Sequence, residues 1–170
     1  MGDYLIRNAT PADFPALQQI EVSAGEPFRN TDLAWVADDP PPSLEALQEH
    51  LDHDALWVIA LDGRPVGYLA GETHADLAVI HQVSIHMAHH RQGLGARLIE
   101  TAIAAAREGG ATAMGLTTYR DIPWNAPYYA RLGFVEVTGA DIPPALAAMR
   151  EAEAAAGHDP ALRCVMVRPL

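Results

Sequence analysis

Two glycines one residue apart, Gly93 and Gly95, stand between an alternating apolar run at residues 77–85 and a stretch with helical spacing at residues 94–107. Glycine permits positive φ angles and lets a ligand approach the bare backbone. The first turn of a helix presents unpaired N–H groups and a partial positive charge. A strand, a glycine turn and a helix N-terminus in this order predict an anion site, most often one for phosphate.

Two common phosphate motifs do not fit this turn. A nucleoside-triphosphate loop needs a lysine and then serine or threonine after its last glycine, whereas Ala96 and Arg97 follow here. A dinucleotide-binding turn needs a further glycine or alanine three residues on, where Leu98 stands.

The segment HRQGLG, residues 90–95, resembles the pyrophosphate loop of the GNAT N-acetyltransferase superfamily. That loop reads Gln or Arg, two residues, glycine, one residue, then glycine or alanine, and His90 departs from it at the first position. A second segment, residues 125–134, resembles the family's later motif, a short tyrosine-bearing helix that ends in Gly-Phe. The resemblance covers about residues 4–137. It implies the GNAT fold, acetyl-CoA as co-substrate and an amine as acceptor.

The resemblance also implies how the acyl-CoA is held. The phosphate groups of acyl-CoA would contact the loop and the first turn of the helix that follows it. The residues in this contact would be His90, Arg91, Gln92, Gly93, Leu94, Gly95, Ala96 and Arg97. Arg91 and Arg97 are alternatively solvated side chains, or Arg97 pairs with Glu100 along the helix. The pantetheine arm needs the edge of a strand, for which the backbone of Val83, Ile85 and Met87 is the candidate. Asn125 either binds pantetheine or caps its helix, and capping is favoured.

Transfer to an amine requires that the ammonium group first lose a proton. Relatives often use a glutamate on the fourth strand, and this strand contains none. Strand alternation places residues 77, 79, 81, 83 and 85 on one face, where His81 is the only titratable group. His81 is therefore one candidate base, with a merely hydrogen-bonded histidine as the equal alternative, and Glu72 is the second candidate.

Tyr129 lies five residues before Phe134, as the general-acid tyrosine does in relatives. The resemblance implies that Tyr129 protonates the departing CoA thiolate and contacts the cofactor, while a packed aromatic ring is the alternative. The neighbouring Tyr128 faces elsewhere on the helix.

Four histidines at 81, 86, 89 and 90 lack a metal-ligand spacing, so no metal is expected. Cys164 lies in an apolar strand and is a poor nucleophile candidate.

The acceptor pocket is expected from the least regular part of the chain, residues 25–35, together with residues 119–121 and the loop at residues 138–144. Acidic side chains there would hold an ammonium group and aromatic rings would cover it, although a solvated acidic face explains the same residues. The candidate substrate-binding residues are Glu26, Phe28, Asp32, Trp35 and Tyr119, with Glu21 as a further acid.

A length of 170 residues fits a single domain, 1–170, with a sizeable core. The net charge of −11 argues against nucleic acid and anionic membranes as partners. It suits a cationic amine, although an acidic surface that only maintains solubility is the simpler explanation. One cysteine and an N-terminus without a secretory pattern favour the cytoplasm. The sequence leaves a homodimer open.

Periodicity and turn signals predict seven strands and five helices. The expected strands are residues 4–7, 56–61, 65–70, 77–85, 113–118, 134–137 and 163–167, and the helices 10–24, 43–51, 94–107, 126–132 and 142–155. This order predicts an α/β (mixed α+β) fold, with a mixed sheet covered by helices. The resemblance adds a mostly antiparallel sheet of about seven strands with splayed central strands. The function predicted is N-acetyl transfer within a ternary complex. The alternative is a non-catalytic acyl-CoA-binding sensor or interaction module.

Overall fold

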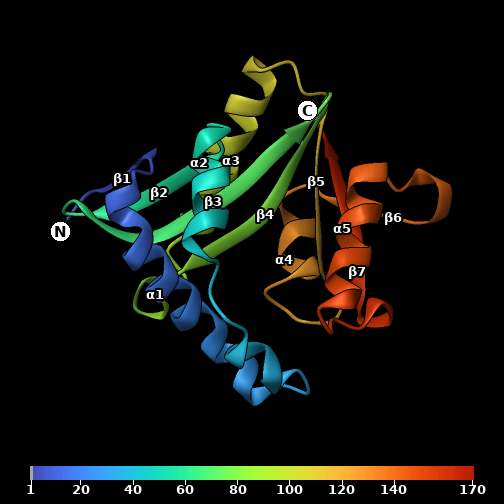
Figure 1. Cartoon of the computed structure of the whole chain (residues 1–170), viewed down its shortest axis with the longest axis horizontal. Helices are drawn as coiled ribbons and strands as arrows, with labels where there is room; N and C mark the ends of the chain where they lie inside the picture. The colour runs from blue at the N-terminus through green and yellow to red at the C-terminus, as the bar shows by residue number, and fades with distance from the viewer. Residues whose placement is uncertain (1) are drawn as a thin grey trace. The chain divides into compact units, whose positions relative to one another are not determined.

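The computed structural model describes residues 2–170 and contains the expected alternation of strands and helices (Figure 1). The strands are β1 (Tyr4–Asn8), β2 (Leu56–Leu61), β3 (Arg64–His74), β4 (Leu77–Ile85), β5 (Ala113–Tyr119), β6 (Val135–Val137) and β7 (Arg163–Pro169). The helices are α1 (Phe14–Gly25), α2 (Leu44–Asp52), α3 (Leu94–Glu108), α4 (Ala126–Arg131) and α5 (Pro144–Ala155). The two largest differences from the sequence prediction are of four residues each: β3 runs to His74 instead of ending at residue 70, and α1 begins at Phe14 instead of residue 10.

The strands form one mixed sheet in the order β1-β2-β3-β4-β5-β7-β6. The pairs β1–β2, β2–β3, β5–β7 and β6–β7 are antiparallel, and β4–β5 is parallel. The predicted fold class, a mixed and mostly antiparallel sheet of seven strands with flanking helices, is therefore confirmed. The chain divides into two compact units, described separately below: unit 1 is residues 2–72 with Gln82–Ala102, and unit 2 is Thr73–His81 with Ile103–Leu170. The single domain expected over 1–170 stays a prediction.

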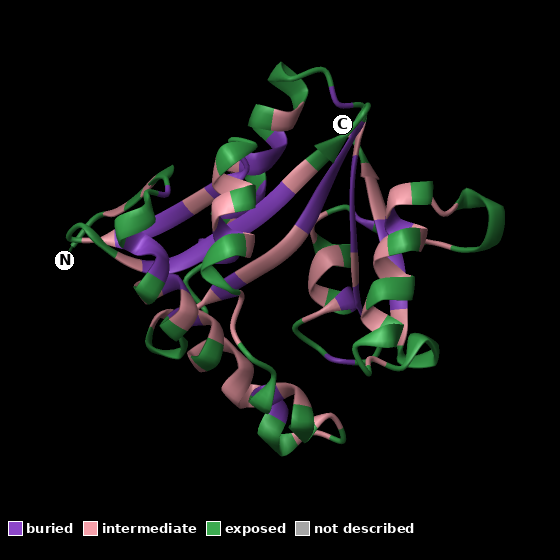
Figure 2. Cartoon of the chain, viewed as in Figure 1, coloured by how far each residue is buried: buried purple, intermediate pink, exposed green. Residues whose placement is uncertain are grey.

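Unit 1 is built on the β2–β3 hairpin. Asp62 and Gly63 connect the strands with φ angles of 49° and 80°, the left-handed pair that a tight hairpin turn requires. α1 follows a single 3-10 turn, Pro11–Asp13, and α2 begins where the Ser43 hydroxyl accepts the Ala46 N–H at 3.1 Å. The apolar faces of both helices pack on the hairpin strands, and Figure 2 shows this core in purple. Its members include Phe14, Leu17, Ile20, Leu47, Leu56, Val58 and Tyr68.

Unit 2 is centred on β5 and β7, whose antiparallel register runs from Ala113 opposite Pro169 to Tyr119 opposite Arg163. The start of β4 pairs in parallel with β5, at Leu77–Val79. Leu146 of α5 is fully buried in a cluster with Leu77, Val79 and Val165. A Cβ atom on Gly115 would lie 2.5 Å from a Leu146 methyl carbon, so this glycine is what lets α5 approach the strand.

The segment between α1 and α2 is the irregular stretch that the sequence predicted. It contains two short 3-10 helices, Glu26–Asn30 and Ala34–Asp38, both in unit 1. Within the described part of the chain, no helix is both long enough and apolar enough to cross a bilayer.

Candidate functional site

The predicted anion loop lies in unit 1, between the end of β4 and the start of α3. After a 3-10 turn, Met87–His89, the chain passes through left-handed backbone at Arg91 (φ 62°) and Gly93 (φ 71°). A Cβ atom on Gly93 would meet nothing within 4 Å, so the φ angle and not the space selects glycine. The Arg97 N–H donates to the Gly93 carbonyl at 3.2 Å as α3 begins. Gly95 is buried in the first turn of α3.

His90, which departs from the family pattern, fastens the loop to the strand before it. Its Nε2 donates to the Ile85 carbonyl at 2.7 Å. Two further histidines brace the same segment: the Ala88 N–H donates to His86 Nδ1, and His89 Nδ1 lies 2.9 Å from the Tyr4 hydroxyl. The loop is therefore held by imidazole contacts on both sides of the 3-10 turn.

Two of the groups predicted to bind the cofactor, the Arg97 guanidinium and the Met87 N–H, form hydrogen bonds within unit 1. The Arg97 guanidinium donates to the Tyr4 carbonyl at 2.8 Å, an option that the sequence did not suggest. The Met87 N–H donates to the Ser23 hydroxyl at 3.0 Å. Arg91, by contrast, has an exposed side chain at the left-handed position of the loop.

A carboxylate of α1, that of Glu21, is the centre of a polar cluster in unit 1. Glu21 accepts hydrogen bonds from the Tyr68 hydroxyl at 2.8 Å, from Ser84 Oγ at 2.5 Å and from Gln82 Nε2 at 2.9 Å. Desolvation by burial raises the pKa of Glu21, with a smaller contribution from the negative charge of Asp39, against the lowering effect of the three donors. Burial and the charge of Glu21 raise the pKa of Tyr68 well above 10.0, so Tyr68 stays a hydrogen-bond donor.

The two predicted bases belong to different units. Glu72 is half-buried near the end of β3 in unit 1. His81 is half-buried in the part of β4 that belongs to unit 2. Their proposed roles stay predictions.

The two tyrosines of α4, in unit 2, have different surroundings, as the sequence suggested. The Tyr129 ring packs edge-on against Phe134 with centroids 5.9 Å apart. Tyr128 has the Arg131 guanidinium 5.8 Å from its ring centroid, and burial raises its pKa. The expectation that Asn125 caps this helix with its side chain is wrong. Asn125 occupies the N-cap position with φ −109° and ψ −115° and makes no side-chain cap hydrogen bond.

The predicted acceptor residues are divided between the two units. In unit 1, Glu26 is paired with Arg29 at 2.9 Å, and Arg29 also contacts Asp38 at 3.0 Å. Phe28 is buried, whereas Asp32 and Trp35 are exposed. Tyr119 is buried in unit 2, where its hydroxyl lies 2.5 Å from His158 Nδ1 and its ring lies under the Arg163 guanidinium.

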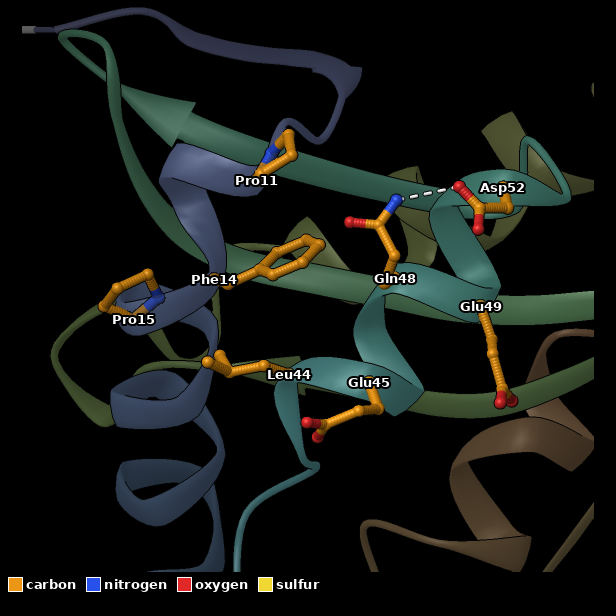
Figure 3. Close-up of a pocket in the computed structure, with 8 residues that line it drawn as sticks. All are labelled: Pro11, Phe14, Pro15, Leu44, Glu45, Gln48, Glu49 and Asp52. Carbon is orange, nitrogen blue, oxygen red and sulfur yellow. Dashed lines mark hydrogen bonds between the residues drawn. The ribbon is translucent and has the colours of Figure 1, made fainter.

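Two other features are a surface groove and the cysteine. A shallow groove of about 590 Å³ between the start of α1 and α2 contains none of the predicted site residues (Figure 3). It is lined by Pro11, Phe14, Pro15, Leu44, Glu45, Gln48, Glu49 and Asp52. Cys164 is buried, which raises the pKa of its thiol and keeps it unreactive. Residues 2–170 hold no group of three or more histidine, cysteine or acidic side chains arranged to bind a metal.

Comparison with known proteins agrees with the strand, loop and helix described above. A sequence model of the acetyltransferase (GNAT) family matches residues 17–134, more than half of the chain, and the chain belongs to that family. The family and its fold support acyl-CoA-dependent N-acetyltransferase activity in general.

Three solved structures illustrate the similarity of fold. N-acetylglutamate synthase from Neisseria gonorrhoeae, complexed with coenzyme A and N-acetyl-glutamate, has a TM-score of 0.73 at 20% identity over 100% of this chain. This chain covers only 36% of the synthase. The PaiA N-acetyltransferase from Thermoplasma acidophilum, in complex with coenzyme A, has a TM-score of 0.73 at 12% identity, with 99% of both chains covered. The ribosomal-protein-S18-alanine N-acetyltransferase from Escherichia coli has a TM-score of 0.68 at 20% identity, with 98% of this chain and 94% of that chain covered.

Proposed function

We propose that this protein transfers the acetyl group of acetyl-CoA directly to a primary amine of a small molecule or peptide, with both substrates bound at once. The observation that carries the proposal is the loop after β4, with left-handed backbone at Arg91 and Gly93 and the buried Gly95 in the first turn of α3. Family membership and the CoA complexes of the structural neighbours support acetyl-CoA as the donor.

The pyrophosphate is proposed to contact the backbone N–H groups of the loop and the first turn of α3, where the partial positive charge of a helix N-terminus favours an anion. His90 contributes by fixing the loop on the Ile85 carbonyl, and Arg91 contributes its exposed charge. The pantetheine arm is proposed to pair with the backbone at Val83 and Ile85, and Asn125 to supply a further contact.

The amine must be neutral to attack the thioester carbonyl, so a proton acceptor is needed. His81 and Glu72 are the candidates that the sequence provides, and the contacts of Glu21 add a third, considered below. Tyr129 is proposed to protonate the departing thiolate. The step needs no metal, because acyl transfer from a thioester proceeds by nucleophilic attack and departure of a stabilised thiolate.

The net charge of −11 suits an amine that arrives as a cation. Glu26, Phe28, Asp32, Trp35 and Tyr119 are proposed to contact the acceptor. We also propose the cytoplasm as the compartment, because the chain has a single buried cysteine, and a homodimer as the assembly to test by sedimentation.

The test is a transfer assay in which acetyl-CoA is mixed with one amine at a time and the free CoA thiol is measured. The panel holds n-butylamine, 1,4-diaminobutane, amino acid amides and short peptides with a free N-terminus, and mass spectrometry identifies the acetylated product. Amine-dependent release of thiol is expected. Binding of CoA without transfer to any amine would contradict the proposal and favour a non-catalytic acyl-CoA-binding module.

A further inference from the structure

The Glu21 carboxylate combines withdrawal from water with hydrogen bonds from neutral side chains. Among residues 2–170, other carboxylates have an arginine beside them: Asp13 with Arg7, Glu26 and Asp38 with Arg29, Glu136 with Arg120 and Glu153 with Arg163. The recorded hydrogen-bond partners of Glu21 are neutral. The charged group that acts on Glu21 is Asp39, which is also negative.

An ionised carboxylate that is withdrawn from water and lacks a cation is costly to maintain. Neutral donors satisfy its oxygens without neutralising its charge. The carboxylate therefore favours binding of a cationic group, or transfer of a proton from that group to its own oxygen. Glu21 as a whole residue keeps partial exposure.

The position of this carboxylate relates it to the proposed reaction. Two of its donors, Gln82 and Ser84, come from β4. They flank Val83, where the backbone of the same strand is proposed to hold the arm of acetyl-CoA. The Glu21 carboxylate therefore contacts the side chains on either side of that backbone, near the place where the amine must meet the thioester.

The geometry points to Glu21 as the catalytic base, the group that binds the acceptor's ammonium and accepts its proton before acetyl transfer. This inference rests on the proposed function. It assigns to α1 a role that the sequence had given to His81 or Glu72.

The proton and electron balance of the step is as follows. One ammonium proton passes to a Glu21 oxygen and leaves a lone pair on nitrogen. That lone pair forms a bond to the thioester carbon. The carbon–sulfur bond then breaks, with its electron pair leaving on the CoA sulfur. As the amide forms, the second proton passes from nitrogen to the thiolate, in our proposal by way of Tyr129, which gives its own proton to sulfur and regains one from nitrogen. Glu21 releases its proton to solvent before the next turnover.

The electrostatics of the cluster fit this role. The pKa of Glu21 is raised, chiefly by desolvation, which makes the carboxylate a stronger base than an exposed glutamate. The groups that face it are Tyr68 from β3, Gln82 and Ser84 from β4, and the charge of Asp39. Tyr68 does not compete for the proton, because its own pKa is raised well above 10.0.

The test compares wild type with Glu21→Gln and with the matched control Glu49→Gln, an exposed glutamate of α2 outside the proposed site. Glutamine keeps the shape of the side chain, and rotation of the Gln82 amide allows its oxygen to face the new NH₂ group. Steady-state kinetics are measured from pH 6 to pH 10 with two acceptors. One acceptor is a tripeptide whose α-amine has a pKa of about 8, and the other is n-butylamine, whose amine resembles that of lysine with a pKa of about 10.4.

At pH 7 we expect Glu21→Gln to lower kcat/KM by about 10²–10⁴-fold, the usual contribution of a general base. The deficit should shrink by about tenfold between pH 7 and pH 10 for the tripeptide, because its neutral fraction rises by about that factor and the amine is then neutral without help. It should shrink more for n-butylamine, whose neutral fraction rises by about 700-fold over the same range, although part of that amine is still protonated at pH 10. The dissociation constant for CoA and the melting temperature should stay near wild type, and Glu49→Gln should match wild type throughout.

A Glu21→Gln variant that is folded and retains full activity at all pH values would overturn the assignment, and so would a deficit that does not depend on pH. If Glu21→Gln does not fold, Ser84→Ala decides the question. Loss of one donor raises the pKa of the Glu21 carboxyl further, so the acidic limb of the kcat/KM profile should move to higher pH. An unmoved limb would overturn the proposal. Failure of the wild-type protein to acetylate any amine would refute the proposed function and the base assignment together.

Discussion

Replacement of Gly93 by alanine separates the two reasons for a glycine in the loop after β4. Gly93 has a φ of 71°, in the left-handed region, and an added Cβ would meet no atom within 4 Å. The effect on folding is therefore that of backbone strain alone, about 1–2 kcal/mol for a residue with a side chain. For a chain of this size, each kcal/mol shifts the melting temperature by about 2–4 °C, so Gly93→Ala should melt about 2–8 °C lower than wild type.

The same methyl group has a second effect if the loop holds a pyrophosphate. It would stand on the surface that a phosphate oxygen must approach and would displace one charge-assisted hydrogen bond, worth about 1.5–3 kcal/mol. This corresponds to a loss of about 10- to 150-fold in CoA affinity. Calorimetric titration with CoA, at a temperature where the variant is fully folded, measures it.

Gly93→Asn is the matched control, because asparagine tolerates left-handed backbone better than alanine does. It should recover part of the lost melting temperature but none of the lost affinity, since it also carries a Cβ. If both variants bind CoA as tightly as wild type while Gly93→Ala alone is destabilised, Gly93 serves only the turn. The pyrophosphate assignment would then be refuted.

Three further perturbations test other parts of the molecule. Tyr129→Phe should lower kcat by about 10²-fold with little change in the KM for acetyl-CoA, whereas Tyr128→Phe should have almost no effect. Steady-state kinetics with one confirmed acceptor measure both variants, and a lowered kcat in Tyr128→Phe alone would reverse the assignment. His81→Ala should retain the acidic limb of kcat/KM, because we assign that limb to Glu21, and a pH–rate profile without the limb would return the role to His81. Asp13→Asn should lower the melting temperature at pH 7, because the pKa of Asp13 is held below its ordinary value of 3.8, first by the hydrogen bonds from Arg7. This stabilisation is present above pH 3.8 and is lost as the pH falls through the folded pKa, so the melting temperatures of variant and wild type should converge in acid. A difference that stays constant with pH would contradict the ion pair as its source.

Local sequence signals were enough to predict most of the fold. The Asp62-Gly63 turn, the Ser43 cap and the Leu77–Ile85 strand each depend on a few neighbouring residues, and each is found in the structure. The strand β3 was predicted too short because Gly71-Glu72-Thr73-His74 is not an apolar alternation, whereas the strand continues to His74. The Asn125 cap was predicted from residue type, but its backbone at φ −109° and ψ −115° lies far from the extended conformation usual for a side-chain cap.

The candidate base shows where such reasoning reaches its limit. Strand alternation correctly places Gln82 and Ser84 on one face of β4, and a polar pair on a face that is otherwise apolar was a visible signal. Alternation does not say which helix covers that face, so the sequence directed attention to the opposite set of residues, which contains His81. The hydrogen bonds of Glu21 span 47, 61 and 63 residues of sequence, and they exist only because α1 packs across β3 and β4. A single acidic residue between Ile20 and Val22 in a helix carries no local mark of that role. Only the packing of α1 brings the Glu21 carboxylate out of water and among three neutral donors. The neutral donors distinguish this candidate base from acids such as Asp13, Glu26 and Glu136, each of which has an arginine beside it.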